Sequence, residues 1–255
     1  MVDSHAHLGL CDAPAAELVA AARGRGVRRI LTVGLDEATN REAIAIAEAH
    51  DEVFAAVGRH PNSAEGFGAS AAAELESLAA HPKVVAIGET GLDFYRDAAS
   101  PEAQRAAFAA QIAIARSAGL PLVIHLRDRG DEAAIGEAFA TLAREAEGVT
   151  VVLHCFSGSP ARAAEAAERS WYCSFAGNVT YPRAGALRDA ARAVPAELLL
   201  AETDAPFLAP QSRRGRPNEP ACVTEVGERL AAERGTGYGE LEAAIEANAA
   251  RVFRW

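Results

Sequence analysis

Two histidines stand two positions apart near the start of the sequence, in the segment Asp3-Ser4-His5-Ala6-His7. Successive side chains of an extended strand point to opposite faces, so His5 and His7 project to the same side. Two convergent imidazoles are half of a metal site. Asp3 has the same parity, and we expect its carboxylate to orient one of the rings from behind.

Further potential metal ligands recur downstream, and each comes at or just after the end of a short apolar run. They are His60, Glu89, His125, His154, and Glu202 with Asp204. Histidine nitrogens and carboxylate oxygens without cysteine suit zinc, manganese or magnesium. The set holds more ligands than one tetrahedral ion needs. It therefore favours two divalent ions, or one ion with a second bound alongside the substrate.

Individual roles follow from residue type and position. Glu89 is the best candidate to bridge two ions, because Lys83, the only lysine in the chain, lies at the opposite end of the same apolar run and cannot serve as a carboxylated bridge. The same position of Lys83 disfavours a Schiff-base aldolase. Asp204 could bind metal and take a proton from an attacking water. Arg127 follows His125 by two residues, and its planar guanidinium matches a phosphate.

The elements that must position these residues alternate regularly along the chain. Short apolar runs predict eight strands near Val2–His5, Arg28–Val33, Val53–Val57, Val84–Gly88, Pro121–His125, Thr150–His154, Trp171–Phe175 and Leu198–Glu202. Stretches with helical spacing lie near Ala13–Arg25, Glu37–His50, Ala69–Ala80, Pro101–Ala118, Asp131–Ala146, Pro160–Ser170, Ala184–Ala193, Pro220–Arg234 and Gly239–Ala249. Eight strand–helix units in 255 residues indicate a (β/α)8 barrel of the TIM type, in a single domain over residues 1–255. A doubly wound sheet is the alternative, but no Gly-x-Gly-x-x-Gly follows a strand.

A (β/α)8 barrel carries its chemistry at the C-terminal ends of its strands. Five of the seven histidines fall at that predicted rim. The other two, His50 and His81, fall at helix ends, where capping is the expected role.

Composition narrows the class of protein. Half of the residues are hydrophobic and no apolar run approaches the roughly 20 residues that cross a bilayer, so we expect no membrane association. No charged and apolar leader precedes the histidines, and the four scattered cysteines suggest reduced thiols, so we expect a cytoplasmic protein without an obligate protein partner. The net charge of −10 argues against broad attraction to nucleic acid, although a bound cation reverses the local field.

The sequence gives weaker support for other catalytic and binding roles. Cys155 should point away from His154, and Ser157 lacks a Gly-x-Ser-x-Gly elbow, so covalent catalysis is disfavoured. Arginines 213, 214 and 216 could bind phosphate or form a solvated charge run. Phe94 and Tyr95 are the aromatic residues most suited to stack on a base, with core packing as the alternative.

Taken together, the motifs resemble the TatD family of metal-dependent hydrolases. The resemblance covers nearly the whole chain in order, through Asp3–Leu8, Gly58–Pro61, Gly88–Asp93, Pro121–Arg127, His154–Gly158, Glu202–Phe207 and Arg214–Pro220. It implies an amidohydrolase-type barrel, a divalent metal centre and cytoplasmic members. It places the family's metal ligands on His5, His7, Glu89, His125, His154 and Asp204. The best-known activity of the family is a metal-dependent DNase, often acting from the 3′ end of single strands.

The expected function is therefore hydrolysis of phosphodiester bonds by metal-activated water, as a 3′–5′ exonuclease on single-stranded DNA or on another phosphodiester substrate. Glu89 and Asp204 would be catalytic, His60 and Arg127 would hold the phosphate, and Asp93 would orient the ligands from behind. One alternative is hydrolysis of another ester or amide, such as D-aminoacyl-tRNA. A second is a non-catalytic barrel that binds nucleic acid.

Overall fold

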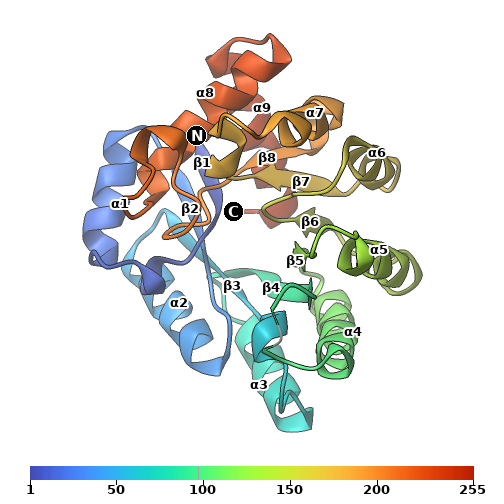
Figure 1. The fold of residues 1–255 in the computed structure, drawn as a ribbon. Coiled ribbons are helices and arrows are strands. Elements are labelled where there is room, and N and C mark those ends of the chain that lie inside the picture. Colours follow the sequence, from blue (N-terminus) through green and yellow to red (C-terminus); the bar gives the residue numbers. More distant parts are fainter. Residues whose placement is uncertain (97) are drawn as a thin grey trace.

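The structure is a computed structural model that describes residues 1–96 and 98–255. Eight parallel strands form one sheet, paired in sequence order from first to last, and Figure 1 shows them at the centre of a ring of helices. They are β1 Val2–Ala6, β2 Arg29–Val33, β3 Val53–Val57, β4 Val84–Asp93, β5 Leu122–Arg127, β6 Val151–Leu153, β7 Tyr172–Phe175 and β8 Leu199–Ala201. The predicted (β/α)8 barrel is confirmed.

The barrel is completed by contacts between β1 and the segment that follows β8. Ala6 forms an isolated parallel bridge with Ala205, and the His7 N–H donates to the Ala205 carbonyl at 2.7 Å. The Asp204 N–H donates to the His5 carbonyl at 2.9 Å. This seam therefore fixes the histidines of β1 beside Asp204, which is 199 positions away from His5 in the sequence.

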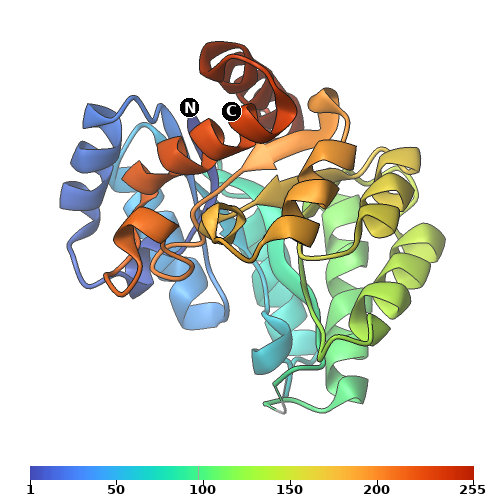
Figure 2. The ribbon, with the colours of Figure 1, turned by 45° about the horizontal axis from the view of Figure 1, so that its top comes forward.

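The helices of the described residues surround the strands, as Figures 1 and 2 show from two directions. They are α1 Ala15–Gly24, α2 Glu37–Ala49, α3 Ala69–Ala79, α4 Pro101–Ala118, α5 Ala133–Glu145, α6 Pro160–Glu168, α7 Gly185–Ala193, α8 Val223–Arg234 and α9 Tyr238–Phe253. The eighth helix was expected to begin at Pro220, but a 3-10 turn over Pro220–Cys222 precedes it. None of the helices in this part of the chain is long and apolar enough to span a membrane.

Local sequence signals explain where several helices begin and end. Asp36 caps α2 in a reciprocal capping box with Thr39. Ser100 and Ser159 cap α4 and α6, and each is followed by a proline at the first helical position. Gly119 ends α4 in the left-handed conformation that favours glycine. Local side-chain chemistry thus fixes the starts of α2, α4 and α6.

Strand β4 is longer than predicted. It was expected to end at Gly88, but it continues to Asp93 with every residue buried, so Glu89 lies inside the strand. The register between β4 and β5 shifts between Ile87 and Thr90, and such irregularities re-aim side chains beside active sites. A Cβ atom on Gly91 would lie 2.1 Å from the His125 carbonyl oxygen, so glycine allows β4 to approach β5 closely.

A candidate metal centre

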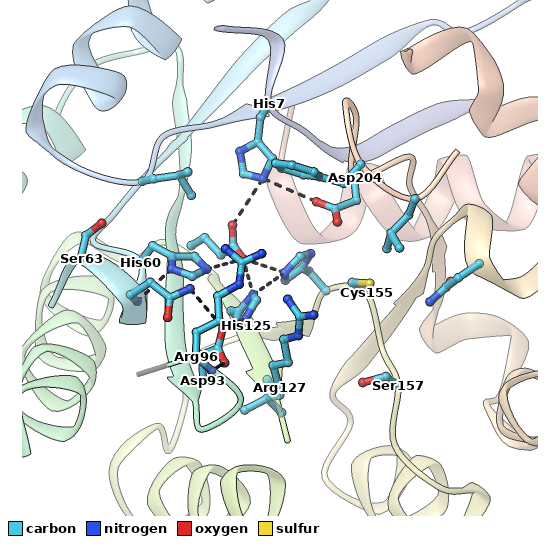
Figure 3. A pocket seen from close by; sticks show the side chains of 18 residues that line it. His7, His60, Ser63, Asp93, Arg96, His125, Arg127, Cys155, Ser157 and Asp204 are labelled. Carbon is cyan, nitrogen blue, oxygen red and sulfur yellow. Dashed lines mark hydrogen bonds and ion pairs between the residues drawn. The ribbon is translucent and has the colours of Figure 1, made fainter. Parts of the chain in front are cut away.

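The predicted site residues meet at one end of the barrel, in a cavity of about 650 Å³. Figure 3 shows His7 and Asp204 on one side of it and His60, Asp93 and His125 on the other. Its wall includes these five residues together with Glu89, His154, Arg96, Arg127, Cys155 and Phe207. The structure thus brings these rim positions together around one cavity.

Glu89 occupies the middle of the cluster and is almost fully buried. Its two carboxylate oxygens face two different groups of side chains. Oε2 lies 3.4 Å from His5 Nε2 and 3.5 Å from His7 Nε2. Oε1 lies 2.6 Å from His125 Nδ1 and 2.8 Å from His154 Nε2. Glu89 therefore joins two adjacent clusters of potential ligands.

The first cluster combines the β1 histidines with Asp204. Nε2 of His5 and Nε2 of His7 are 3.2 Å apart. Asp204 Oδ1 lies 3.5 Å from His7 Nε2 and 3.9 Å from His5 Nε2. Four potential ligand atoms, counting Glu89 Oε2, thus point toward one small volume.

The second cluster combines the histidines of β5 and of the segment after β6. His125 Nδ1 lies 3.3 Å from His154 Nε2, and both atoms face Glu89 Oε1. His60 Nε2 lies 3.4 Å from the same oxygen. The ring of His154 also stacks on that of His5, with centroids 3.8 Å apart, so the two clusters share a wall.

Hydrogen bonds on the far side of two rings fix which nitrogen is available. His7 Nδ1 donates to the Val33 carbonyl at 3.0 Å, and His154 Nδ1 donates to Glu202 Oε1 at 3.2 Å. In a neutral imidazole the other nitrogen then carries the lone pair, so Nε2 of each ring presents it to the cluster. A ring held in this way from behind is the usual arrangement of a metal-bound histidine.

His60 has the opposite arrangement. Its Nδ1 accepts a hydrogen bond from the Asn62 N–H at 3.0 Å, so Nε2 carries the proton in the neutral ring. Burial lowers the pKa of His60, which favours that neutral form. His60 therefore offers a hydrogen-bond donor to the cavity, while His7 and His154 offer lone pairs.

The two residues expected to support the ligands from behind differ in outcome. Asp93 Oδ2 lies 3.4 Å from His125 Nε2, and its carboxylate also accepts from Asn62 Nδ2 and from the Tyr95 and Arg96 N–H groups. The Asp93 carboxylate thus lies beside the His125 nitrogen that faces away from Glu89.

Asp3 was predicted to orient an imidazole ring, but its carboxylate is bound to other groups. Its carboxylate accepts from Thr203 N at 2.9 Å, from Thr203 Oγ1 at 2.6 Å and from the His5 backbone N–H at 3.3 Å. Asp3 is fully buried, and burial raises its pKa to about 8 despite these bonds. The physical reason for the difference is the seam after β8, which brings Thr203 to this carboxylate.

The charges of the cluster are strongly coupled. Burial alone would raise the pKa of Glu89, but His154, His60 and His125 outweigh it and hold that pKa well below its ordinary value. Burial alone would lower the pKa of His154, but Glu89 and Glu202 hold it well above its ordinary value. The pKa of Asp204 is lowered too, because its histidine neighbours outweigh burial. Glu89 and Asp204 are thus ionised at neutral pH.

The donor set fits divalent metal ions. Glu89 Oε2 is buried and has no hydrogen-bond partner among the described residues. A buried carboxylate oxygen without a partner is costly in an apolar interior. Ligand atoms bound about 2.0–2.2 Å from one tetrahedral ion lie about 3.3–3.6 Å from each other, and most distances in the first cluster are of that size. The clusters can therefore bind metal.

Cationic side chains approach this centre from one side. Figure 3 shows Arg127 and Arg96 extending toward the cluster. Arg127 was predicted, whereas Arg96 was not, and its position after Asp93 was the only signal for it. The Arg127 guanidinium lies 4.3 Å from the centroid of the Tyr95 ring.

The remaining sequence candidates lie outside the cluster. Phe94 is partly buried against the core, while Tyr95 is exposed. Arg213 pairs with Glu219, and the Arg214 guanidinium lies 4.6 Å from the centroid of the Tyr181 ring. Burial and the carboxylates Asp204, Glu202 and Glu89 raise the pKa of the Cys155 thiol well above its ordinary value, so it is a poor nucleophile.

Several supporting residues were missed by sequence reasoning. Glu202 was placed at the rim without a role, yet it accepts from His154 Nδ1 and from the Cys155 N–H. Gln104 and Gln111 lie on one face of α4, and their side-chain amides are buried. Gln104 holds both peptide groups of Asp93, and Gln111 holds both peptide groups of Arg59, next to His60. In the sequence, the only signal for these hydrogen bonds is the seven-residue spacing, which places both glutamines on the same face of a helix.

Comparison of the sequence with known proteins identifies the family of this chain. A family model described as TatD related DNase matches residues 2–254. An uncharacterized metal-dependent hydrolase, YabD of Bacillus subtilis (strain 168), is 37% identical over 258 aligned positions that cover 100% of this chain and 99% of the relative. The 3'-5' ssDNA/RNA exonuclease TatD of Klebsiella pneumoniae (strain 342) is 36% identical over 243 positions, which cover 93% of this chain and 90% of the relative.

Solved structures agree with the sequence relatives. The crystal structure of YjjV, a TatD homologue from Escherichia coli K12, superimposes with a TM-score of 0.92 at 28% identity, covering 100% of this chain and 98% of that one. A TatD family hydrolase from Entamoeba histolytica gives a TM-score of 0.87 at 19% identity, covering 99% of this chain and 97% of that one, a likeness of fold.

Proposed function

This chain belongs to the TatD family of metal-dependent hydrolases, and from that premise we propose that it is a 3′–5′ exonuclease that hydrolyses single-stranded nucleic acid with two divalent metal ions. The substrate and the polarity come from the names of relatives such as the Klebsiella exonuclease. The number of ions comes from the two clusters around Glu89.

The proposed metal ligands form two sets that share one bridge. His5, His7 and Asp204 would hold one ion, His125 and His154 the other, and Glu89 would contribute one oxygen to each. Magnesium, manganese and zinc all suit such nitrogen and oxygen ligands. Bound ions of this kind activate water and neutralise charge on the reacting phosphate.

The other residues of the cavity would bind the substrate and move protons. The His60 Nε2–H, on a ring kept neutral by burial, would donate to a phosphate oxygen. Arg127, joined by Arg96 on the same side, would hold the phosphate through its guanidinium. Asp204 is ionised and would accept the proton of the attacking water. Asp93 would keep the His125 ring in place through Nε2.

The single observation that carries the proposal is the division of the Glu89 carboxylate. Oε1 and Oε2 face separate histidine pairs, at 2.6–2.8 Å and 3.4–3.5 Å, and Oε2 lacks any hydrogen-bond partner in the described chain. A residue that only balanced charge would not need both oxygens to face ligand atoms. A bridge between two ions would.

Cleavage of single-stranded DNA labelled at its 5′ end tests the proposal. With Mg²⁺ or Mn²⁺ we expect the wild type to give a ladder that shortens from the 3′ end. Glu89→Gln should lower the rate by about 100-fold or more, because one shared ligand and its charge are lost. Glu76→Gln, an exposed change on α3, is the matched control and should leave the ladder unchanged.

Other outcomes would redirect the proposal. Metal-loaded wild type that leaves single-stranded DNA and RNA intact would contradict the exonuclease and point to a small ester or to aminoacyl-tRNA as substrate. Binding without cleavage would favour a non-catalytic barrel. We place the reaction in the cytoplasm, in keeping with the free thiols of Cys11, Cys155, Cys173 and Cys222.

A further inference from the structure

Large apolar side chains that are exposed gather at one end of the barrel. Within the described chain they are Leu10, Tyr95 and Phe207, with 41%, 53% and 51% of their surface exposed. Each follows the C-terminal end of a strand, namely β1, β4 and β8. This is the end that holds the metal-binding clusters.

Phe207 is the one of the three that lines the cavity. Its ring meets the ring of His7 at a centroid distance of 6.0 Å and an interplanar angle of 70°. It therefore lies directly beside the first cluster of potential ligands, yet half of the side chain remains open to solvent.

The backbone that carries Phe207 is firmly held. The Phe207 N–H donates to the Asp204 carbonyl at 2.8 Å. Asn218, which is buried, donates from Nδ2 to the carbonyls of Phe207 and Thr203, at 2.6 and 2.8 Å. The exposure of the ring is thus built into an ordered turn, and such a preorganised aromatic binds a flat partner with little loss of conformational freedom.

Tyr95 differs from Phe207 in one respect. The Arg127 guanidinium already lies over the Tyr95 ring at 4.3 Å. The ring contact of Phe207 within the described residues is the T-shaped one with His7. Phe207 is therefore the better placed of the two to receive a base inside the cavity.

We propose that Phe207 is a substrate-positioning residue that stacks on the base of one of the two nucleotides flanking the scissile phosphate. This inference rests on the proposed function and names the part of the substrate that the site recognises. A chain of net charge −10 gains little from long-range attraction to phosphates, so base stacking supplies binding energy that charge does not. Stacking also tolerates any base, as an exonuclease requires.

The test combines substitutions of Phe207 with removal of a base from the DNA substrate. Wild type, Phe207→Leu and Phe207→Trp are compared on single-stranded DNA with an intact 3′ end and on the same DNA with an abasic analogue at the last or the penultimate nucleotide. For wild type we expect an abasic analogue at one of these positions to raise KM about tenfold. Phe207→Leu should raise KM by a similar factor on intact DNA and cause no further rise on that abasic DNA. Phe207→Trp should behave as wild type.

Two measurements separate stacking from structural damage. Metal content and thermal stability of Phe207→Leu should match those of wild type, because the ring lies outside the ligand set. Leu10→Ala, an exposed apolar residue on the same face outside the cavity, is the matched control and should leave KM unchanged.

The failures are distinguishable. If wild type cleaves intact and abasic ends with equal KM, or if the effects of Phe207→Leu and the abasic analogue multiply, stacking on Phe207 is wrong while the exonuclease stands. If metal-loaded wild type cleaves neither of these DNAs nor single-stranded RNA, the proposed function and this inference both fail.

Discussion

At the scale of single residues, the site is defined by which nitrogen of each ring faces the cavity. His7 and His154 donate from Nδ1 to Val33 and Glu202, so in their neutral forms Nε2 carries the lone pair that a metal needs, whereas His60 accepts at Nδ1 and presents an N–H. The same residue type thus serves as ligand or as donor according to one hydrogen bond. This distinction separates residues that would hold metal from one that would hold phosphate.

Metal binding should release protons near neutral pH. Carboxylates outweigh burial and raise the pKa values of His7, His125 and His154 in the metal-free protein, and a histidine must lose its proton to bind a metal. Calorimetric titration with Mn²⁺ or Zn²⁺ should therefore give apparent enthalpies that depend on the ionisation enthalpy of the buffer. Affinity should weaken as the pH falls from about 8 to about 6.

The control for this prediction is His81→Gln, which changes a histidine that pairs with Glu48 away from the site. It should release as many protons as the wild type. Binding enthalpies that are the same in every buffer would show that the histidines are already neutral in the metal-free protein.

Much of the residue list could be predicted from the sequence, because polar residues that end buried strands of a (β/α)8 barrel meet at one rim. What could not be predicted depends on pairs that are distant in sequence. The role of Glu202 depends on His154 lying beside it. The Asp3 carboxylate accepts hydrogen bonds from the N–H and the hydroxyl of Thr203, across the seam that joins β1 to the segment after β8. Spacing along one strand carries no information on such contacts.

At the scale of elements, the strands that carry the ligands depart from regular pairing where the ligands lie. The β1–β2 register shifts between Asp3 and Ala6, and the β4–β5 register shifts between Ile87 and Thr90. These irregularities surround His5 and Glu89. The sequence predicted both strands, but β4 runs five residues past its expected end at Gly88, to Asp93. The extension follows from pairing with β5, which propensity does not report.

Helix α2 offers a test of local stabilisation outside the site. Asp36 caps it, and although burial opposes the effect, hydrogen bonds from Thr39 lower the pKa of Asp36. Asp36→Ala should reduce the free energy of unfolding by about 1 kcal/mol at pH 7. A lowered folded pKa gives stability that is present above the ordinary value of 3.8 and is lost as the pH falls below it, so the deficit should shrink in acid.

Denaturant unfolding at several pH values measures this deficit. Asp36→Asn is the matched variant, because asparagine keeps the capping oxygen but does not titrate. It should stay close to wild type at pH 7. A deficit of Asp36→Ala that grows in acid would mean that Asp36 stabilises the fold by another route.

At the scale of the whole molecule, an acidic protein has a site that would bind an anionic polymer. The net charge is −10, and the cationic groups in the wall of the cavity are Arg96 and Arg127. Affinity for nucleic acid would then come from the metal centre, from these two arginines and from stacking. Contacts with a long backbone would contribute little.

Salt dependence measures that balance. For two or three neutralised phosphates, a plot of log affinity for single-stranded DNA against log salt should have a slope of about −1.4 to −2.1. Lengthening the DNA beyond a few nucleotides should change affinity little. A slope steeper than about −5 would reveal an extended basic track, contrary to this account.

The central claim is that Glu89 bridges two ions, and anomalous diffraction from crystals soaked in Mn²⁺ tests it most directly. We predict two peaks, one beside His5, His7 and Asp204 and one beside His125 and His154, with one oxygen of Glu89 within bonding distance of each. Crystals of Glu89→Gln should lose at least one peak. A single peak in the wild type, or two peaks that do not share Glu89, would contradict the account.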